Sequence, residues 1–164
     1  MIFIGLGANL PTARFGAPVD ACAAALRAIG AAGPRVARRS RWYRSAPVPP
    51  SGQPWFVNGV AALETDLAPA ALLALLHGVE RAFGRVRRQR NEARTLDLDL
   101  LIYHEMVSAP GAVPVLPHPR LAERAFVILP LSELAPDWRH PASGLGVAEM
   151  IARLPPEQAA EPLA

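Results

Sequence analysis

The chain has 164 residues, of which 51% are hydrophobic and 19% are charged, so it is long enough for a core of its own and too apolar for a disordered protein. All 17 cationic residues are arginines, which excludes the lysine of a P-loop or of a Schiff base, and the net charge of +3 favours a local anion site over wrapping a long polymer. The lone Cys22 excludes an internal disulfide, and no run approaches the roughly 18 apolar residues of a membrane span. We therefore expect a cytoplasmic protein without membrane contacts.

The first half of the chain predicts three strands and one helix. Residues 1–7 form a short apolar strand that ends in glycines, and residues 36–43 and 55–65 form two more. Between the first two strands, apolar residues at helical spacing predict a helix over residues 18–29, which Gly30 can end. This half of the chain therefore has the order β-α-β-β.

The second and third predicted strands are joined by a segment with two candidate binding features. Residues 45–54 are too rich in proline for a helix or a sheet, and a loop of this length in a compact domain is either functional or disordered. Its Pro47 and Pro50 also fit a polyproline ligand. Asn58 follows as a polar residue in an apolar strand. Its amide can bind the edge of a flat heterocycle, although a core asparagine bonded to the backbone fits the sequence equally well.

The next predicted helix begins at Pro69 and ends before Gly84, and a strand over residues 96–103 follows it. This helix brings His77 and Glu80 within one turn of each other near its C-terminal end. A lone helical histidine is usually structural, but this one lies close to a run of arginines, so His77 is a candidate ligand contact.

The C-terminal part of the chain is less regular. His118 is held between two prolines and could donate a hydrogen bond to a phosphate. Residues 147–154 predict a short helix and residues 155–164 a loose tail, so we expect one domain over residues 1–154.

Leucine and aspartate alternate along the strand over residues 96–103. Because residues two apart on a strand share a face, Asp97 and Asp99 project together with their Cα atoms about 6.5 Å apart. Two carboxylates at this spacing can converge on Mg²⁺, which binds one or two protein carboxylates and fills its remaining positions with water and phosphate oxygens. The alternative is a solvated sheet face, although aspartate is depleted in strands and like charges on one face repel.

A basic run directly precedes this strand. Between residues 81 and 94 the chain has one acid, Glu92, and arginines at positions 81, 85, 87, 88, 90 and 94. Guanidinium groups bind phosphate oxygens bidentately, so the run and the aspartate pair together predict phosphoryl chemistry on a polyphosphate. Taken alone, a basic run favours nucleic-acid binding or simple solubility.

The expected order β-α-β-β-α-β is the pattern of an α+β, ferredoxin-like antiparallel sheet with helices packed on one face, here with extra C-terminal elements. RNA-binding modules share this pattern, so a ferredoxin-like RNA-binding module that uses the 81–94 arginine run is the competing hypothesis. Such a module would carry an aromatic signature on its two central strands, which residues 2–7 and 57–63 lack. A structural subunit without activity is a third possibility.

A series of short motifs follows one order along the chain, at residues 7–10, 43–45, 56–65, 84–87, 94–99, 117–120 and 124–126. Together they resemble the 6-hydroxymethyl-7,8-dihydropterin pyrophosphokinase family over residues 2–141. The resemblance implies an ATP-dependent diphosphokinase, a transferase of folate biosynthesis that moves pyrophosphate from ATP to the hydroxymethyl group of a reduced pterin and releases AMP. It implies small-molecule substrates and no nucleic acid, and we expect a monomer.

The resemblance also implies a role for each matching position. Asp97 and Asp99 look like the ligands of two Mg²⁺ ions, and with Arg85 and Arg94 they form the predicted catalytic set. The predicted ATP-binding residues are His77, Glu80, Arg87, Arg94, His118 and Arg124. The predicted pterin-binding residues are Ser45, Ala46, Val48, Phe56, Asn58 and Phe126. The two phenylalanines of this set would sandwich the pterin ring, because aromatic systems stack face to face with an offset.

Two positions depart from the family pattern. Residues 91–94 read Asn-Glu-Ala-Arg, whereas the family often has a proline before this arginine, so an acid stands near the expected phosphates. Pro119 occupies the position of a second aromatic residue found in some members. Neither departure affects the aspartate pair.

Overall fold

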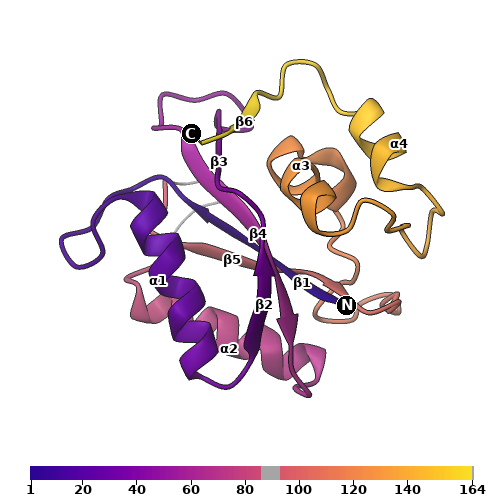
Figure 1. Cartoon of the computed structure of the whole chain (residues 1–164), viewed down its shortest axis with the longest axis horizontal. Coiled ribbons are helices and arrows are strands. Elements are labelled where there is room, and N and C mark those ends of the chain that lie inside the picture. The colour runs from indigo at the N-terminus through magenta and orange to yellow at the C-terminus, as the bar shows by residue number, and fades with distance from the viewer. Residues whose placement is uncertain (86–92, 164) are drawn as a thin grey trace.

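An antiparallel sheet forms the centre of the α+β fold in the computed structural model, which describes residues 1–85 and 93–163 (Figure 1). The strands run in the order β5-β1-β4-β3-β6, and β2 also pairs with β4. The strands are β1 (Ile2–Ala8), β2 (Arg35–Arg39), β3 (Tyr43–Ser45), β4 (Phe56–Glu64), β5 (Asp97–Tyr103) and β6 (Ala160–Pro162). The helices are α1 (Pro18–Ala31), α2 (Pro69–Ala82), the 3-10 turn η1 (Leu121–Glu123), α3 (Ala125–Leu134) and α4 (Val147–Ala152).

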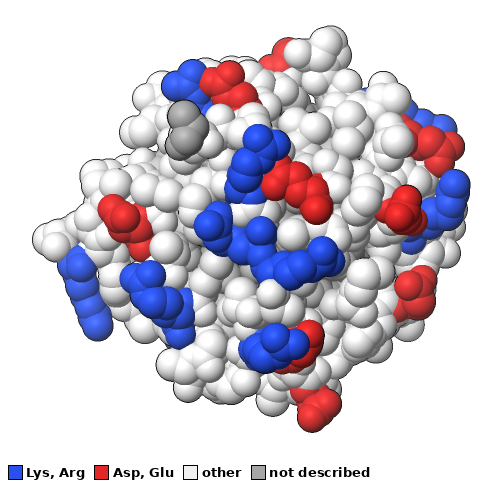
Figure 2. All heavy atoms as spheres, viewed as in Figure 1, with Lys and Arg blue, Asp and Glu red and all other residues white. Residues whose placement is uncertain are grey.

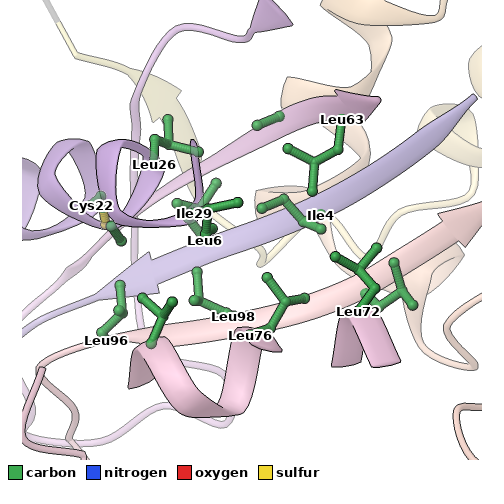
Figure 3. Packing of buried hydrophobic residues seen from close by; sticks show 14 of the residues in the cluster. Ile4, Leu6, Cys22, Leu26, Ile29, Leu63, Leu72, Leu76, Leu96 and Leu98 are labelled. Atoms are coloured by element: carbon green, nitrogen blue, oxygen red, sulfur yellow. The ribbon is translucent and has the colours of Figure 1, made fainter. Parts of the chain in front are cut away.

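Helices cover both faces of this sheet. On one face, α1 and α2 pack against Leu96, Leu98 and other buried side chains of the sheet, as Figure 3 shows. On the opposite face, α3 and α4 pack over Phe3 and Leu101 (Figure 1). The prediction of helices on one face is therefore wrong for the C-terminal helices, because α3 carries enough apolar side chains to bury the second face. Each helix in the described residues is too short or too polar to cross a bilayer.

The central strand β1 positions the predicted site residues of its two neighbours. Gly7 of β1 pairs with Asn58 of β4 and with Asp97 of β5, and Gly5 pairs with Asp99. A β carbon at Gly7 would lie 3.1 Å from Asn58 Oδ1, so a glycine leaves the space that this amide occupies. The sheet register therefore brings the predicted pterin-reading amide beside the aspartate pair.

The strand predicted over residues 36–43 is divided into β2 and β3. The buried Ser40 lies at the division, where its hydroxyl accepts from the amide of Val60 at 3.0 Å and donates to the carbonyl of Arg41 at 2.7 Å. The ring of Trp42 then fills the space above Gly59 of β4, where a β carbon would lie 2.7 Å from two ring atoms. The hydrogen bonds of the Ser40 side chain and the ring contact of Trp42 thus stabilise the break between β2 and β3. The local sequence predicts neither of these interactions.

Replacing Gly59 by alanine is expected to lower the free energy of unfolding by about 1–3 kcal/mol, because the new methyl group overlaps the indole ring of Trp42. Urea unfolding followed by circular dichroism measures this change. Gly30→Ala is the matched control: Gly30 lies in α1 with open space around its Cα, so alanine there should stabilise the protein by about 0.5–1 kcal/mol. Equal effects of the two substitutions would contradict the contact.

The structure also differs from the prediction at the end of α1 and in the C-terminal tail. The helix α1 continues through Gly30, and Gly33, with φ +124°, follows its end. Residues 160–162, which belong to the predicted loose tail, form β6 against β3 and carry an ion pair between Glu161 and Arg44. Backbone pairing at a sheet edge needs no apolar pattern, which is why the sequence did not predict this strand.

Glu133 of α3 fixes this helix to the connection between β2 and β3. Its carboxylate accepts from the hydroxyl of Tyr43 at 2.6 Å, and from the backbone amide and the Nε of Arg41 at 2.8 and 2.9 Å. Burial alone would raise the pKa of Glu133, but the hydrogen bonds from Tyr43 and Arg41 lower it overall. The ionised carboxylate is therefore the form that holds α3 on the sheet.

Removing the hydroxyl in Tyr43→Phe is expected to lower the free energy of unfolding by about 1.5–3 kcal/mol at pH 7, the range for a hydrogen bond to a charged group. A carboxyl whose folded-state pKa is lowered contributes stability above its ordinary pKa of 4.5 and loses it as the pH falls through the folded value. The difference between wild type and variant should therefore shrink below pH 4.5 in urea titrations at several pH values. A difference that stays constant down to acid would contradict the role of the carboxylate.

Candidate active site

A cavity lies where β3, β4 and β5 meet the proline-rich loop and the start of α3. It is lined by Gly7, Ser45, Ala46, Pro47, Val48, Pro49, Ser51, Gln53, Phe56, Asn58, Arg94, Asp97, Arg120, Arg124 and Phe126. This lining includes every predicted pterin-binding residue. It also includes an aspartate and two arginines predicted to bind metal and phosphate. One cavity therefore joins the two halves of the predicted site.

The pterin side of the cavity combines aromatic rings with a fixed amide. Asn58 is 5% exposed and donates to Ser45 Oγ at 2.7 Å, which sets the orientation of its side chain. Phe56 and Phe126 both line the cavity, and each has a guanidinium group over its ring, at 5.8 Å for Arg94 and 5.5 Å for Arg124. Two aromatic rings and a buried amide thus share this cavity, and the two arginines over the rings also lie beside the aspartates of β5.

Asn9, which the sequence did not mark as a site residue, connects the two loops that border the cavity. Its side-chain nitrogen donates to Gln53 Oε1 at 3.2 Å and to the carbonyl of Pro54 at 3.0 Å. Its side-chain oxygen accepts from the amide of Arg94 at 2.8 Å, and its own amide donates to the carbonyl of Arg94 at 3.0 Å. A polar residue that directly follows a buried strand was the available signal, since Asn9 is 2% exposed.

Asp97 is surrounded by the arginines that the sequence predicted beside it. Arg94 Nη1 lies 2.6 Å from Asp97 Oδ2, and Arg85 forms an ion pair with the other carboxylate oxygen. Arg85 is in turn held from α2, because its Nη1 donates to Glu80 Oε1 at 3.1 Å. Both guanidinium groups are largely buried, with 10% of the Arg85 side chain and 16% of the Arg94 side chain exposed. The site is thus a dense, internally paired charge cluster.

The two aspartates differ in their affinity for protons. Burial would raise the pKa of Asp97, but the charges of Arg94 and Arg85 outweigh it and lower the pKa overall. Burial and then the negative charge of Asp97 raise the pKa of Asp99 to about 6. Asp97 is therefore a poor proton acceptor, whereas the charge of Asp99 is incompletely compensated by Arg124, whose Nη1 lies 3.7 Å from Asp99 Oδ2.

His118 presents a neutral ring near this cluster. Its backbone amide donates to the carbonyl of Leu101 at 2.8 Å, which places it beside β5. Burial, followed by the charge of Arg124, lowers the pKa of His118 to about 4. Since Nδ1 accepts a hydrogen bond from the backbone amide of Arg120 at 3.2 Å, Nε2 carries the ring proton and can donate to an anion.

Four predicted ATP-binding residues, namely His118, His77, Glu80 and Arg87, are not among the described residues that line the cavity. His77 lies half-buried on α2. Glu80 is 2% exposed, and its carboxylate accepts from Arg85 and, at 2.8 Å, from the amide of Leu98. Arg87 lies outside the residues that the structure describes. For Glu80, the geometry supports a positioning role behind Arg85.

The donor set fits magnesium in the presence of phosphate. Across residues 1–85 and 93–163, no group of three or more His, Cys, Asp or Glu side chains could hold a metal ion by itself. Mg²⁺ does not need such a group, because phosphate oxygens and water complete its coordination. Burial, and after it the negative charge of Asp97, raises the pKa of Asp99, and a divalent cation beside the two carboxylates would compensate the charge of the ionised form.

Known proteins are similar to this chain in sequence. The family model described as 7,8-dihydro-6-hydroxymethylpterin-pyrophosphokinase matches residues 3–136. A 2-amino-4-hydroxy-6-hydroxymethyldihydropteridine pyrophosphokinase of Pseudomonas aeruginosa is 42% identical over 154 residues, which cover 94% of this chain and 91% of that protein. A protein of the same name from Synechocystis is 38% identical over 149 residues, 90% of this chain and 73% of that protein. The chain therefore belongs to the 7,8-dihydro-6-hydroxymethylpterin-pyrophosphokinase family, and it is a pyrophosphokinase, a transferase.

Proposed function

We propose that the protein transfers pyrophosphate from ATP to the hydroxymethyl group of 6-hydroxymethyl-7,8-dihydropterin, giving AMP and the pterin diphosphate in folate biosynthesis. The observation that carries this proposal is the shared cavity, in which aromatic walls and a buried amide meet a carboxylate and arginines. The aromatic rings and the amide suit a flat heterocycle with polar edges, and the carboxylate and arginines suit a polyphosphate with its metal ions. The family match supports the same reaction.

The pterin is bound at the inner end of the cavity in this proposal. Phe56 and Phe126 stack on its two faces, and the amide of Asn58 bonds to its polar edge. Ser45 supports the amide, and the backbone of Ala46 and Val48 supplies further contacts from the loop. Asn9 keeps this loop next to Arg94, so the ring is held at a fixed distance from the phosphate-binding side chains.

ATP is the co-substrate, and its phosphates meet the arginines. Arg85, Arg94, Arg124 and the Nε2 of His118 bind phosphate oxygens, with Arg87 as a further contact from the segment outside the described residues. Asp97 and Asp99 would hold two Mg²⁺ ions, which supply charge neutralisation on the phosphate oxygens when bound. The arginines that now pair with the aspartates then turn part of their donors towards the substrate.

The reaction is an in-line displacement. The pterin hydroxyl oxygen attacks the β-phosphorus of ATP and a new oxygen–phosphorus bond forms, while the bond between the β-phosphorus and the α,β-bridging oxygen breaks. AMP leaves with this oxygen and its bonding electrons, and the hydroxyl proton is released to solvent. The chain contributes positioning of the two substrates and compensation of the charge that develops on the transferred group. The low pKa of Asp97 argues against this carboxylate as the base that accepts the hydroxyl proton.

An incubation of the protein with Mg²⁺, ATP and the reduced hydroxymethylpterin, analysed for nucleotides, tests the proposal. AMP that forms only when the pterin is present supports it, whereas ADP or no nucleotide turnover contradicts it. The competing RNA-binding module predicts salt-sensitive RNA binding without Mg²⁺ instead. Its arginines Arg85 and Arg94 are largely buried, and on the face shown in Figure 2 several arginines lie beside acidic side chains. Both observations favour the enzyme.

We propose a ferredoxin-like βαββαβ core in which β2 and β3 together form the second strand, since both pair with β4. We propose a single domain, which the pairing of β6 with β3 extends beyond residue 154 to residues 160–162. We also propose that the protein is a monomer that acts on small molecules in the cytoplasm.

A further inference from the structure

The cavity contains a cation, Arg120, that belongs to the motif at residues 117–120 but has no predicted role and no place in the charge cluster around Asp97. Arg120 lines the cavity together with Arg94 and Arg124, and of the described lining residues Asp97 is the one acid. Arg94 is paired with Asp97, and Arg124 lies 3.7 Å from Asp99. The lining therefore has more positive than negative charge.

Arg120 is held weakly by its own acidic neighbour. Its Nε lies 3.9 Å from Glu123 Oε2, and the two side chains are 48% and 69% exposed. An exposed pair at this distance contributes about 0–1 kcal/mol, so little free energy opposes an exchange of partner. The guanidinium group can leave Glu123 for an anion in the cavity.

The backbone that carries Arg120 is nevertheless fixed. Arg120 immediately precedes η1, in which Leu121 is fully buried against the core under α3. The amide of Leu121 donates to the carbonyl of His118 at 2.9 Å, and the amide of Arg120 donates to His118 Nδ1 at 3.2 Å. The side chain of Arg120, which only a weak ion pair holds, thus extends from a turn whose backbone is fixed beside β5.

The surrounding charges also favour an anion. Burial is the larger cause of the lowered pKa of both His118 and Arg124, and the positive charge of Arg120 lowers both further. Arg120 and Arg124 therefore repel each other, and this repulsion is relieved when a negative group lies between them.

We propose that Arg120 binds the diphosphate group of the pterin product, and so holds the transferred group after AMP has formed. The anion is assigned to the pterin because the cavity that Arg120 lines is the one that holds Phe126 and Asn58. A diphosphate attached to a ring between the phenylalanines would extend towards the arginines. This inference rests on the proposed function and adds a residue to its binding site.

Binding measurements on Arg120→Gln test the inference. Isothermal titration with the pterin diphosphate should show roughly tenfold weaker binding than wild type, as expected for the loss of one charge-assisted contact. Binding of the hydroxymethylpterin, which has no phosphate, should be unchanged. Arg120→Lys should recover part of the affinity, and Arg27→Gln, a charge removal at an exposed position of α1, should behave as wild type.

The outcomes separate this inference from the proposed function. If wild type forms AMP and Arg120→Gln binds the diphosphate as wild type does, the inference fails and the proposed function stands. If Arg120→Gln loses affinity for both pterins equally, the substitution disturbs the cavity and the inference also fails. If wild type forms no AMP and binds neither pterin, the proposed function fails, and the inference that rests on it fails as well.

Discussion

Asp97→Asn is expected to reduce AMP formation by roughly 10²–10³-fold, the range observed when one electrostatic contact to the reacting group is removed. Asparagine has nearly the same shape, but it has no charge for a divalent cation and turns an amide N–H₂ group towards a guanidinium group. Arg94 would lose its ion pair at 2.6 Å, so its direction would change as well. The expected loss therefore combines metal binding and the placement of a phosphate contact.

The variant should remain folded. Arg85 keeps two acceptors when Asp97 is neutral, since its Nη1 also donates to Glu80 Oε1 at 3.1 Å and to the carbonyl of Leu96 at 3.0 Å. The initial rate of AMP formation, with circular dichroism and a urea titration on the same samples, measures both effects. Asp137→Asn, an exposed position, is the control and should retain wild-type turnover. Turnover near the wild-type rate in Asp97→Asn would rule out the assigned metal site.

The strands that carry the site residues could be predicted from patterns in the local sequence. A period of two placed Asp97 and Asp99 on one face of a strand, and in the structure they alternate with Leu98 and Leu100, which are buried in the core under α1 and α2. A polar residue in an apolar strand drew attention to Asn58, which lines the cavity. Such residues can be predicted because the strand period and the contrast of polarity are properties of a few neighbouring residues.

The parts that could not be predicted depend on partners distant in the chain. Asn9 acts through Gln53, Pro54 and Arg94, and its role appears only when these segments are folded together. The helix α3 was not predicted as such, because it contains Pro130 and has apolar side chains on most sides. Its burial against the second face compensates for the lost backbone hydrogen bond.

The family resemblance predicted which residues lie near one another in the site, but not which of them contact the substrate. It grouped Glu80 with the ATP-binding residues because Glu80 aligns with a family position near the nucleotide. The structure shows that Glu80 is buried on α2 and that its carboxylate faces Arg85 and the amide of Leu98. Distance along the chain cannot distinguish a side chain that contacts a ligand from one that holds the contacting side chain.

Glu80→Ala is expected to lower the free energy of unfolding by about 3–5 kcal/mol, because it breaks a buried ion pair and leaves a charged partner behind. The amide of Leu98 would lose its acceptor as well. In the described part of the chain, Arg85 Nε is already buried without a hydrogen-bond partner, so Arg85 depends on the contacts of its Nη1. Glu80→Gln should lower the free energy of unfolding by only about 1–3 kcal/mol, because the side-chain amide oxygen of glutamine can still accept from the backbone amide of Leu98.

Urea unfolding of both variants measures these changes, with the exposed Glu157→Ala as the control for losing a carboxylate. Kinetics of the folded Glu80→Gln variant then distinguish the two roles of this residue. If Glu80 positions Arg85, kcat should fall while KM for ATP changes little, because Arg85 still reaches Asp97 but is no longer held in one orientation. If Glu80 contacted the nucleotide directly, KM for ATP would rise instead and the stability of Glu80→Ala would stay close to that of Glu157→Ala.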